Sequence, residues 1–212
     1  MLVSAYITTL RERLFDPSPG AGWTDTNLIG YLNEAINATC LIKADAYVLQ
    51  GYIALTTGVT QELPAAGIAL LDITENQVSG RRITQVDRAL LDEENRFWPA
   101  ATQEVDVQHF AVDKLAPRRF YITPPNTSTG SVKALYGALP TALTATTDTV
   151  LLQDIYQPAL LAYAISRAYL KPSRADPQKS AAAFNEWATM VGAKTKTQAE
   201  TSPRVAEAKG VV

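Results

Sequence analysis

The chain has 212 residues, of which 47% are hydrophobic and 19% charged, with a formal net charge of -2. These fractions indicate a globular chain of one or two domains, and the near-neutral charge excludes the global basic signature of a nucleic-acid binder. The single cysteine, Cys40, excludes an intrachain disulfide and predicts a buried thiol. No apolar run approaches the ~20 residues of a membrane span, and no signal-peptide core is present, so we expect a soluble protein made in the cytoplasm.

The first fifty residues predict two helices. Residues 2–14 form the first, because apolar side chains recur at spacings of three and four. Its inner face comprises Val3, Ile7, Leu10 and Leu14. A segment rich in proline and glycine at residues 15–22 ends this helix. Thr24 or Asp25 then caps a second helix that we expect to continue to about residue 47.

The middle of the chain changes to the period of β-strands. Short strands are predicted at residues 52–57, 70–74 and 82–87, followed by a short acidic helix at residues 88–95. Three further strands follow in meander order at residues 108–113, 118–123 and 131–136. The turn between the last two is polar and long for a hairpin, which predicts a loop that meets a partner. Its candidate residues are Pro124, Pro125, Asn126 and Gly130.

Two helical segments separated by Pro172 follow. Residues 154–170 are apolar on nearly every side, which predicts a helix buried all round, in part by neighbouring subunits. The candidate residues of this oligomer-contact or core helix are Tyr156, Leu160, Leu161, Tyr163, Ile165, Arg167 and Tyr169. Asp176 and Pro177 mark the start of the next helix. Its predicted apolar stripe comprises Ala181, Phe184, Ala188 and Val191.

These elements predict an α+β fold in which the N- and C-terminal helices form one bundle with a central antiparallel β lobe. Residues 1–50 and 151–196 are assigned to the helical bundle and residues 51–150 to the β-rich lobe. Residues 197–212 are assigned to a flexible C-terminal tail, because they hold too few large apolar side chains to bury much surface.

No residues form a recognisable catalytic, cofactor-binding or metal site. His109 is the single histidine, and no second histidine or cysteine stands at the spacing of a metal ligand. Asp92, Glu93 and Glu94 occupy consecutive helix positions and point in different directions, so they cannot converge on one cation. Phosphate-binding glycine loops and serine-hydrolase motifs are also missing. We therefore expect no enzyme and no cofactor.

Motifs spread along the whole chain resemble the head-to-tail adaptor proteins of tailed bacteriophages, also called head-completion or neck proteins. The matching segments are Trp23-Thr24-Asp25 with Leu28 and residues 31–35, Leu63-Pro64 with residues 70–73, residues 83–88, Phe97-Trp98-Pro99, residues 117–125, and Tyr156, Ala159, Leu160, Tyr163, Arg167, Tyr169 and Lys171 followed by Ala182 and Phe184. The order of these segments carries the resemblance more than any one of them.

The resemblance implies a structural virion protein at the head–tail junction, assembled in the host cytoplasm. It implies a homo-oligomeric ring, typically of twelve copies, that joins the portal protein to tail or nozzle proteins. DNA would pass through its lumen without specific binding. In such adaptors the C-terminal segment reaches along the portal, which makes portal-docking candidates of Lys194, Lys196, Arg204 and Lys209.

Two alternatives of other classes stay open from the residues. A virion-associated hydrolase would need convergent carboxylates, and none can be located from the sequence. A nucleic-acid-binding module would need a basic face. The doublets Arg81-Arg82 and Arg118-Arg119 each begin a predicted strand, where alternation places one arginine on each face.

Overall fold

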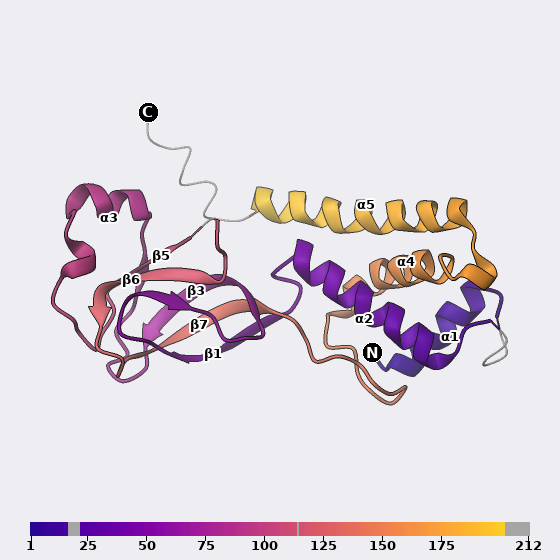
Figure 1. Ribbon diagram of the computed structural model, residues 1–212, viewed down its shortest axis with the longest axis horizontal. Coiled ribbons are helices and arrows are strands. Elements are labelled where there is room, and N and C mark those ends of the chain that lie inside the picture. Colours follow the sequence, from indigo (N-terminus) through magenta and orange to yellow (C-terminus); the bar gives the residue numbers. More distant parts are fainter. Residues whose placement is uncertain (17–21, 114, 202–212) are drawn as a thin grey trace. The chain divides into compact units, whose positions relative to one another are not determined.

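The chain folds first into helices, then into strands, and then again into helices (Figure 1). The computed structural model describes residues 1–16, 22–113 and 115–201. Two compact units are present. The helical unit comprises Met1–Lys43 together with Pro140–Val212, and the β unit comprises Ala44–Leu139. The β unit is therefore one continuous insertion between the two segments of the helical unit, which pack together although they are far apart in the sequence.

In its described residues the helical unit contains four α-helices, which are α1 (Val3–Arg13), α2 (Asp25–Ile42), α4 (Gln157–Ala168) and α5 (Pro177–Thr201). Short 3-10 turns at Asp154–Tyr156 and Pro172–Arg174 precede α4 and α5. The start of α2 is set by a capping box, in which the Thr24 hydroxyl accepts from the Asn27 N–H and the Asn27 side chain accepts from the Thr24 N–H. This arrangement satisfies backbone donors that have no partner within the helix.

Helix α4 is the centre of the helical unit. It packs against α2 and α5 and also contacts α1, and every residue from Ala159 to Ala164 is buried. Six consecutive buried positions cover all sides of a helix with 3.6 residues per turn. The helix is therefore buried on all sides from Ala159 to Ala164, and one chain supplies this cover by itself, whereas Pro158 is exposed and Ile165 and Arg167 are partly exposed.

Several hydrogen-bonded side chains join the segment before the β unit to the segment after it. They include Trp23, whose Nε1 donates to the Ala168 carbonyl (3.1 Å), Asn33, which pairs with the Leu143 backbone, and Trp187, whose Nε1 donates to Thr39 Oγ1 (3.3 Å). The Asn33 amide donates to the Leu143 carbonyl and accepts from its N–H, both at 2.9 Å. These bonds add orientation to the non-directional apolar contacts.

The end of α1 is joined to the start of α2 by an ion-pair network around Arg11, which is 8% exposed, whereas the Asp25 side chain is 49% exposed. Its guanidinium contacts Asp16 Oδ2 at 3.3 Å and Asp25 Oδ1 at 2.6 Å and donates to the Trp23 carbonyl at 3.1 Å. Asp16 also accepts from the backbone N–H of Trp23. The network compensates the buried charges and places the Trp23 ring against the end of α4.

The β unit contains two sheets. The three-stranded sheet has the order β1 (Val48–Ala54), β7 (Ser131–Ala138) and β3 (Gly67–Asn76). The four-stranded sheet has the order β2 (Gly58–Glu62), β6 (Arg119–Asn126), β5 (His109–Val112) and β4 (Thr84–Gln85). Helix α3 (Arg88–Glu94) and a 3-10 turn at Trp98–Ala100 lie between β4 and β5 in the chain.

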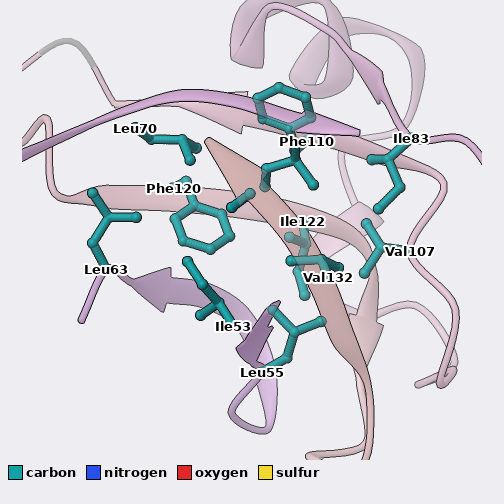
Figure 2. Close-up of a cluster of buried hydrophobic side chains, with 12 residues drawn as sticks. Ile53, Leu55, Leu63, Leu70, Ile83, Val107, Phe110, Phe120, Ile122 and Val132 are labelled. Carbon is teal, nitrogen blue, oxygen red and sulfur yellow. The ribbon is translucent and has the colours of Figure 1, made fainter. Parts of the chain in front are cut away.

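Apolar side chains from both sheets form one core (Figure 2). Ile53, Leu70 and Val132 contribute from the three-stranded sheet, and Phe110 and Phe120 from the four-stranded sheet. Phe110 and Phe120 are fully buried. Burial of a large side chain contributes about 1.5–3 kcal/mol, so this cluster is the main stabilising element of the β unit.

Strand β3 does not follow the usual two-residue alternation. Its buried positions are Gly67, Leu70, Ile73 and Asn76, which recur every third residue. The reason is the pairing with β7, where the register shifts three times, so that β3 needs extra residues to follow its partner. Each shift inserts one unpaired residue and bends the strand.

The predicted fold class is wrong, although the structure does combine helices with two sheets. The closely packed helices are α2, α4 and α5, whereas α1 contacts the others much less and α3 belongs to the β unit, so the terminal helices do not form one clear bundle. The strands do not form one antiparallel lobe either, because they divide into two sheets and β4 pairs with β5 in parallel. The predicted meander also ends early, since β6 and β7 lie in different sheets.

The predicted apolar stripe of the last helix is also shifted. The buried positions of α5 include Ala183, Trp187 and Val191, whereas Ala181, Phe184 and Ala188 are exposed. Alanine is abundant on several faces of this helix, so spacing alone does not select one face. Trp187, the largest side chain of the segment, is the signal that identifies the inner face.

A charge placed at Leu161 should destabilise the helical unit severely. This side chain is 2% exposed, so Leu161→Asp removes apolar contacts and buries a carboxylate, and we expect a loss of at least about 3 kcal/mol in the free energy of unfolding. Ile165→Asp is the matched control, since Ile165 is partly exposed and its carboxylate can reach water. Urea denaturation followed by circular dichroism measures both. Equal losses for the two variants would contradict the described burial of α4.

Candidate interaction surfaces

The seven candidate residues of the oligomer-contact or core helix divide by exposure. Tyr156, Leu160, Leu161 and Tyr163 are buried within the subunit. Ile165, Arg167 and Tyr169 are partly exposed. The four buried side chains are accounted for by the core of the subunit itself. Ile165, Arg167 and Tyr169 are the three of the seven that reach the surface and are available for direct contact with another copy.

Arg167 belongs to a polar cluster on the surface of α2 and α4. Its guanidinium donates to the Tyr163 hydroxyl at 2.7 Å and pairs with Glu34 Oε2 at 3.1 Å. An open groove of about 380 Å³ lies beside this pair. The groove is lined by Asn27, Tyr31, Glu34, Arg167, Leu170, Lys171 and Pro172. The cation and the carboxylate compensate each other, and the arrangement holds no activated nucleophile.

The candidate tail-facing residues occupy a different setting from the predicted hairpin turn. Pro124, Pro125 and Asn126 belong to β6, and the Thr123–Pro124 peptide bond is cis. Gly130 ends the connection of residues 127–130, which leads from the four-stranded sheet to the three-stranded sheet. Pro125, Asn126 and Gly130 are buried, so the exposed part of this connection is Ser128 and Thr129.

Asn126 holds this connection together. Its side-chain Nδ2 donates to the carbonyls of Glu104 and Val105 at 3.1 and 2.8 Å. Its Oδ1 accepts from the N–H groups of Ser128 and Gly130 at 2.9 and 3.1 Å. An added Cβ on Gly130 would collide with the Val105 carbonyl and with the Asn126 amide, so this position requires glycine.

The candidate portal-docking residues fall at the end of the chain. Lys194 and Lys196 lie within α5, whose helix continues to Thr201. Arg204 and Lys209 lie outside the described residues, as do residues 202–212 of the predicted tail.

Cysteine and histidine are the residue types most often used in catalysis or metal binding. In the described ranges the cysteine is unreactive and the histidine is isolated. Cys40 is 1% exposed, and burial raises the pKa of its thiol to about 11, so the thiol stays protonated at neutral pH. The buried Nδ1 of His109 has no hydrogen-bond partner within the described part of the chain. Across residues 1–16, 22–113 and 115–201, no three His, Cys, Asp or Glu side chains gather as a metal site would require. Over the same ranges no helix has the length and apolarity needed to cross a membrane.

A family model described as SU10 adaptor protein matches residues 1–207, which include nearly all of both units. The chain belongs to the SU10 adaptor protein family. This family consists of phage head-to-tail adaptors, so the resemblance found in the sequence is confirmed. No curated protein matches the chain. Membership implies a structural role in the virion and interaction with portal and tail components.

In this SU10 adaptor, substitution of Asn126 should destabilise the β unit. Asn126→Ala leaves four backbone groups without their side-chain partner, and we expect a loss of about 2–4 kcal/mol in the free energy of unfolding. Asn126→Asp should cost at least as much, because a carboxylate oxygen would face two carbonyl oxygens. Thr129→Ala is the control on the same connection, since the Thr129 hydroxyl is exposed and contacts the Thr127 hydroxyl. Thermal and urea denaturation give the comparison, and an unaffected Asn126→Ala would show that water replaces the amide.

Proposed function

We propose that this SU10 adaptor is one subunit of a homo-oligomeric ring that joins the portal protein to the tail and continues the DNA channel. The observation that carries the proposal is the family match over residues 1–207, because it includes the helical unit and the β unit together. A net charge of -2 supports a lumen through which DNA passes without specific binding, since retention of phosphates would require an excess of cations.

Contacts between neighbouring subunits are assigned to the helical unit, with α4 directly beneath them. The support is the outer face of α5, where Phe184 is 43% exposed although it is large and apolar. Its ring packs at 5.2 Å from the Trp187 ring and 6.3 Å from the Tyr163 ring. Phe184 is thus held in place by α4 and α5, which makes it a preorganised anchor for a neighbouring copy.

Substitution of Phe184 by aspartate should weaken ring formation while the subunit still folds. The charged side chain can remain in water in the isolated subunit but would be desolvated in a contact between copies, and we expect at least about a tenfold loss of assembly. Asn185→Asp introduces the same charge at the next exposed position of α5 and serves as control. Mass photometry of each variant, alone and mixed with the portal protein, gives the stoichiometry. Rings of normal size from the Phe184→Asp variant would exclude this face.

Docking to the portal is assigned to the C-terminal segment with its basic residues Lys194, Lys196, Arg204 and Lys209. The composition supports this assignment, because residues 202–212 hold few large apolar side chains and cannot bury much surface by themselves. A contact that fixes the backbone of these eleven residues would cost on the order of 11–22 kcal/mol of entropy, so it must be extensive.

Deletion of residues 202–212 should leave the melting temperature unchanged and lower the affinity for the portal protein. A second variant, Arg204→Ala with Lys209→Ala, keeps the length of the segment and removes two charges. If contacts along the backbone dominate, the deletion weakens binding strongly and the double substitution only about two- to tenfold. Surface plasmon resonance with immobilised portal measures both, and an unchanged affinity of the deletion variant would remove the segment from the portal contact.

A further inference from the structure

Helix α5 carries a second apolar stripe, which points out of its own subunit. This outer stripe consists of Ala181, Phe184 and Ala188, three residues of the stripe that the sequence predicts. Their spacings of three and four place them on one side of the helix, and all three are exposed. The inner side of α5 is formed by other residues, among them Trp187 and Val191. The outer stripe is therefore open to a partner.

A second exposed apolar surface lies where the start of the chain meets the segment before α4. We call it the aliphatic patch, and its residues are Met1, Leu2, Leu151 and Ile155. Each of them is between 43% and 64% exposed. The Val150 N–H donates to the Met1 carbonyl at 3.0 Å, and the terminal amine pairs with Asp154 Oδ1 at 3.3 Å. These bonds bring the four residues together, and contiguous exposed apolar surfaces of this kind mark sites of association.

Buried neighbours hold the aliphatic patch in place. Leu151 stands between Val150 and Leu152, which are both buried, and Val3 is fully buried next to Leu2. The Val3 N–H also donates to the Asp148 carbonyl at 2.9 Å. The exposed side chains therefore project from a fixed backbone, which lowers the entropy that a contact has to offset.

The two surfaces lie on opposite sides of α4. Helix α5 packs against α4, and α1, which begins beside the aliphatic patch, also packs against α4. In Figure 1 α5 lies above α4 and the N-terminus lies below it. Two unlike surfaces on opposite sides of one subunit permit a head-to-tail contact, which closes as a ring when the rotation per subunit completes a turn.

We propose that the aliphatic patch of one copy packs on the outer stripe of α5 of the next copy around the ring. The shapes are complementary, because Ala181 and Ala188 are short and leave hollows on either side of the Phe184 ring. Long aliphatic side chains such as those of Leu151 and Ile155 fill such hollows. This inference rests on the proposed function, because it names the surface that receives Phe184 in the contact between subunits.

A second copy is the occupant that accounts for both surfaces. Every copy carries one aliphatic patch and one outer stripe, so a contact between copies covers the two in equal number. A portal or tail component on one of them would leave the other exposed to water. Pairing of the aliphatic patch with itself would bring long side chains against long side chains and would stop at two copies.

Crosslinking between introduced cysteines tests the contact directly. The native Cys40 is 1% exposed and its thiol stays protonated, so it does not compete. A chain with both Leu151→Cys and Ala188→Cys keeps the Phe184 anchor. A short bis-maleimide, added to this variant alone and mixed with the portal protein, should give a ladder of covalent adaptor multimers on a denaturing gel.

The two single variants are the controls for crosslinking. Leu151→Cys and Ala188→Cys, each alone, should give monomers on the same gel, because a head-to-tail contact brings unlike positions together. Covalent dimers from either single variant would show that like surfaces meet and would overturn the proposed arrangement.

Leu151→Asp provides an independent test. Its carboxylate can remain in water in the isolated subunit but would be desolvated against α5 of the next copy, so we expect at least about a tenfold loss of assembly. Leu170→Asp is the matched control, since Leu170 is 52% exposed, Leu151 is 51% exposed, and Leu170 lies beyond the other end of α4. Circular dichroism checks the fold and mass photometry measures the rings. Equal losses for the two variants would contradict the contact.

The outcomes separate this inference from the proposed function. Rings of normal size that give no covalent ladder with the double cysteine variant would overturn the contact and leave the adaptor role intact. Absence of rings from the wild-type protein, both alone and with the portal protein, would contradict the proposed function itself.

Discussion

The packing of α4 against α2 is the contact on which the helical unit depends. These helices belong to segments separated by the whole β unit, so no local interaction brings them together. The entropy of closing this long connection must be offset by burial of α4, whose residues from Ala159 to Ala164 are all inaccessible. Because this burial is completed within one chain, the outer residues of α5 remain free for other contacts.

Polar side chains fix how the apolar layers are oriented in both units. In the helical unit, the paired bonds between Asn33 and Leu143 set the position of the returning chain beside α2. In the β unit, Asn76 plays the same part, since its amide donates to the Val107 carbonyl and accepts from its N–H, both at 2.8 Å. The Asn76 amide is buried and the Asn33 amide is partly buried, and each satisfies backbone groups of a loop and thereby rigidifies one connection.

The two units offer different kinds of surface to partners. On α5 the candidate surface is the exposed side chain of Phe184, which is held by the aromatic side chains of Tyr163 and Trp187. This arrangement suits a contact between side chains. On β1 it is a row of backbone donors and acceptors, because β1 lies at the edge of its sheet. An adaptor in a family that contacts both portal and tail components needs several such surfaces on one small subunit.

Local pattern in the sequence determined much of the secondary structure. The spacing of Val3, Ile7 and Leu10 predicts α1, and Asp176 before Pro177 predicts the start of α5, because both signals act within one or two turns. The family was also recognisable from the order of residues along the chain. Tertiary structure alone decided that β6 and β7 enter different sheets and that β1 lies at the edge of its sheet. Each depends on which distant segments meet, and a local period of two or 3.6 residues carries no information about that partner.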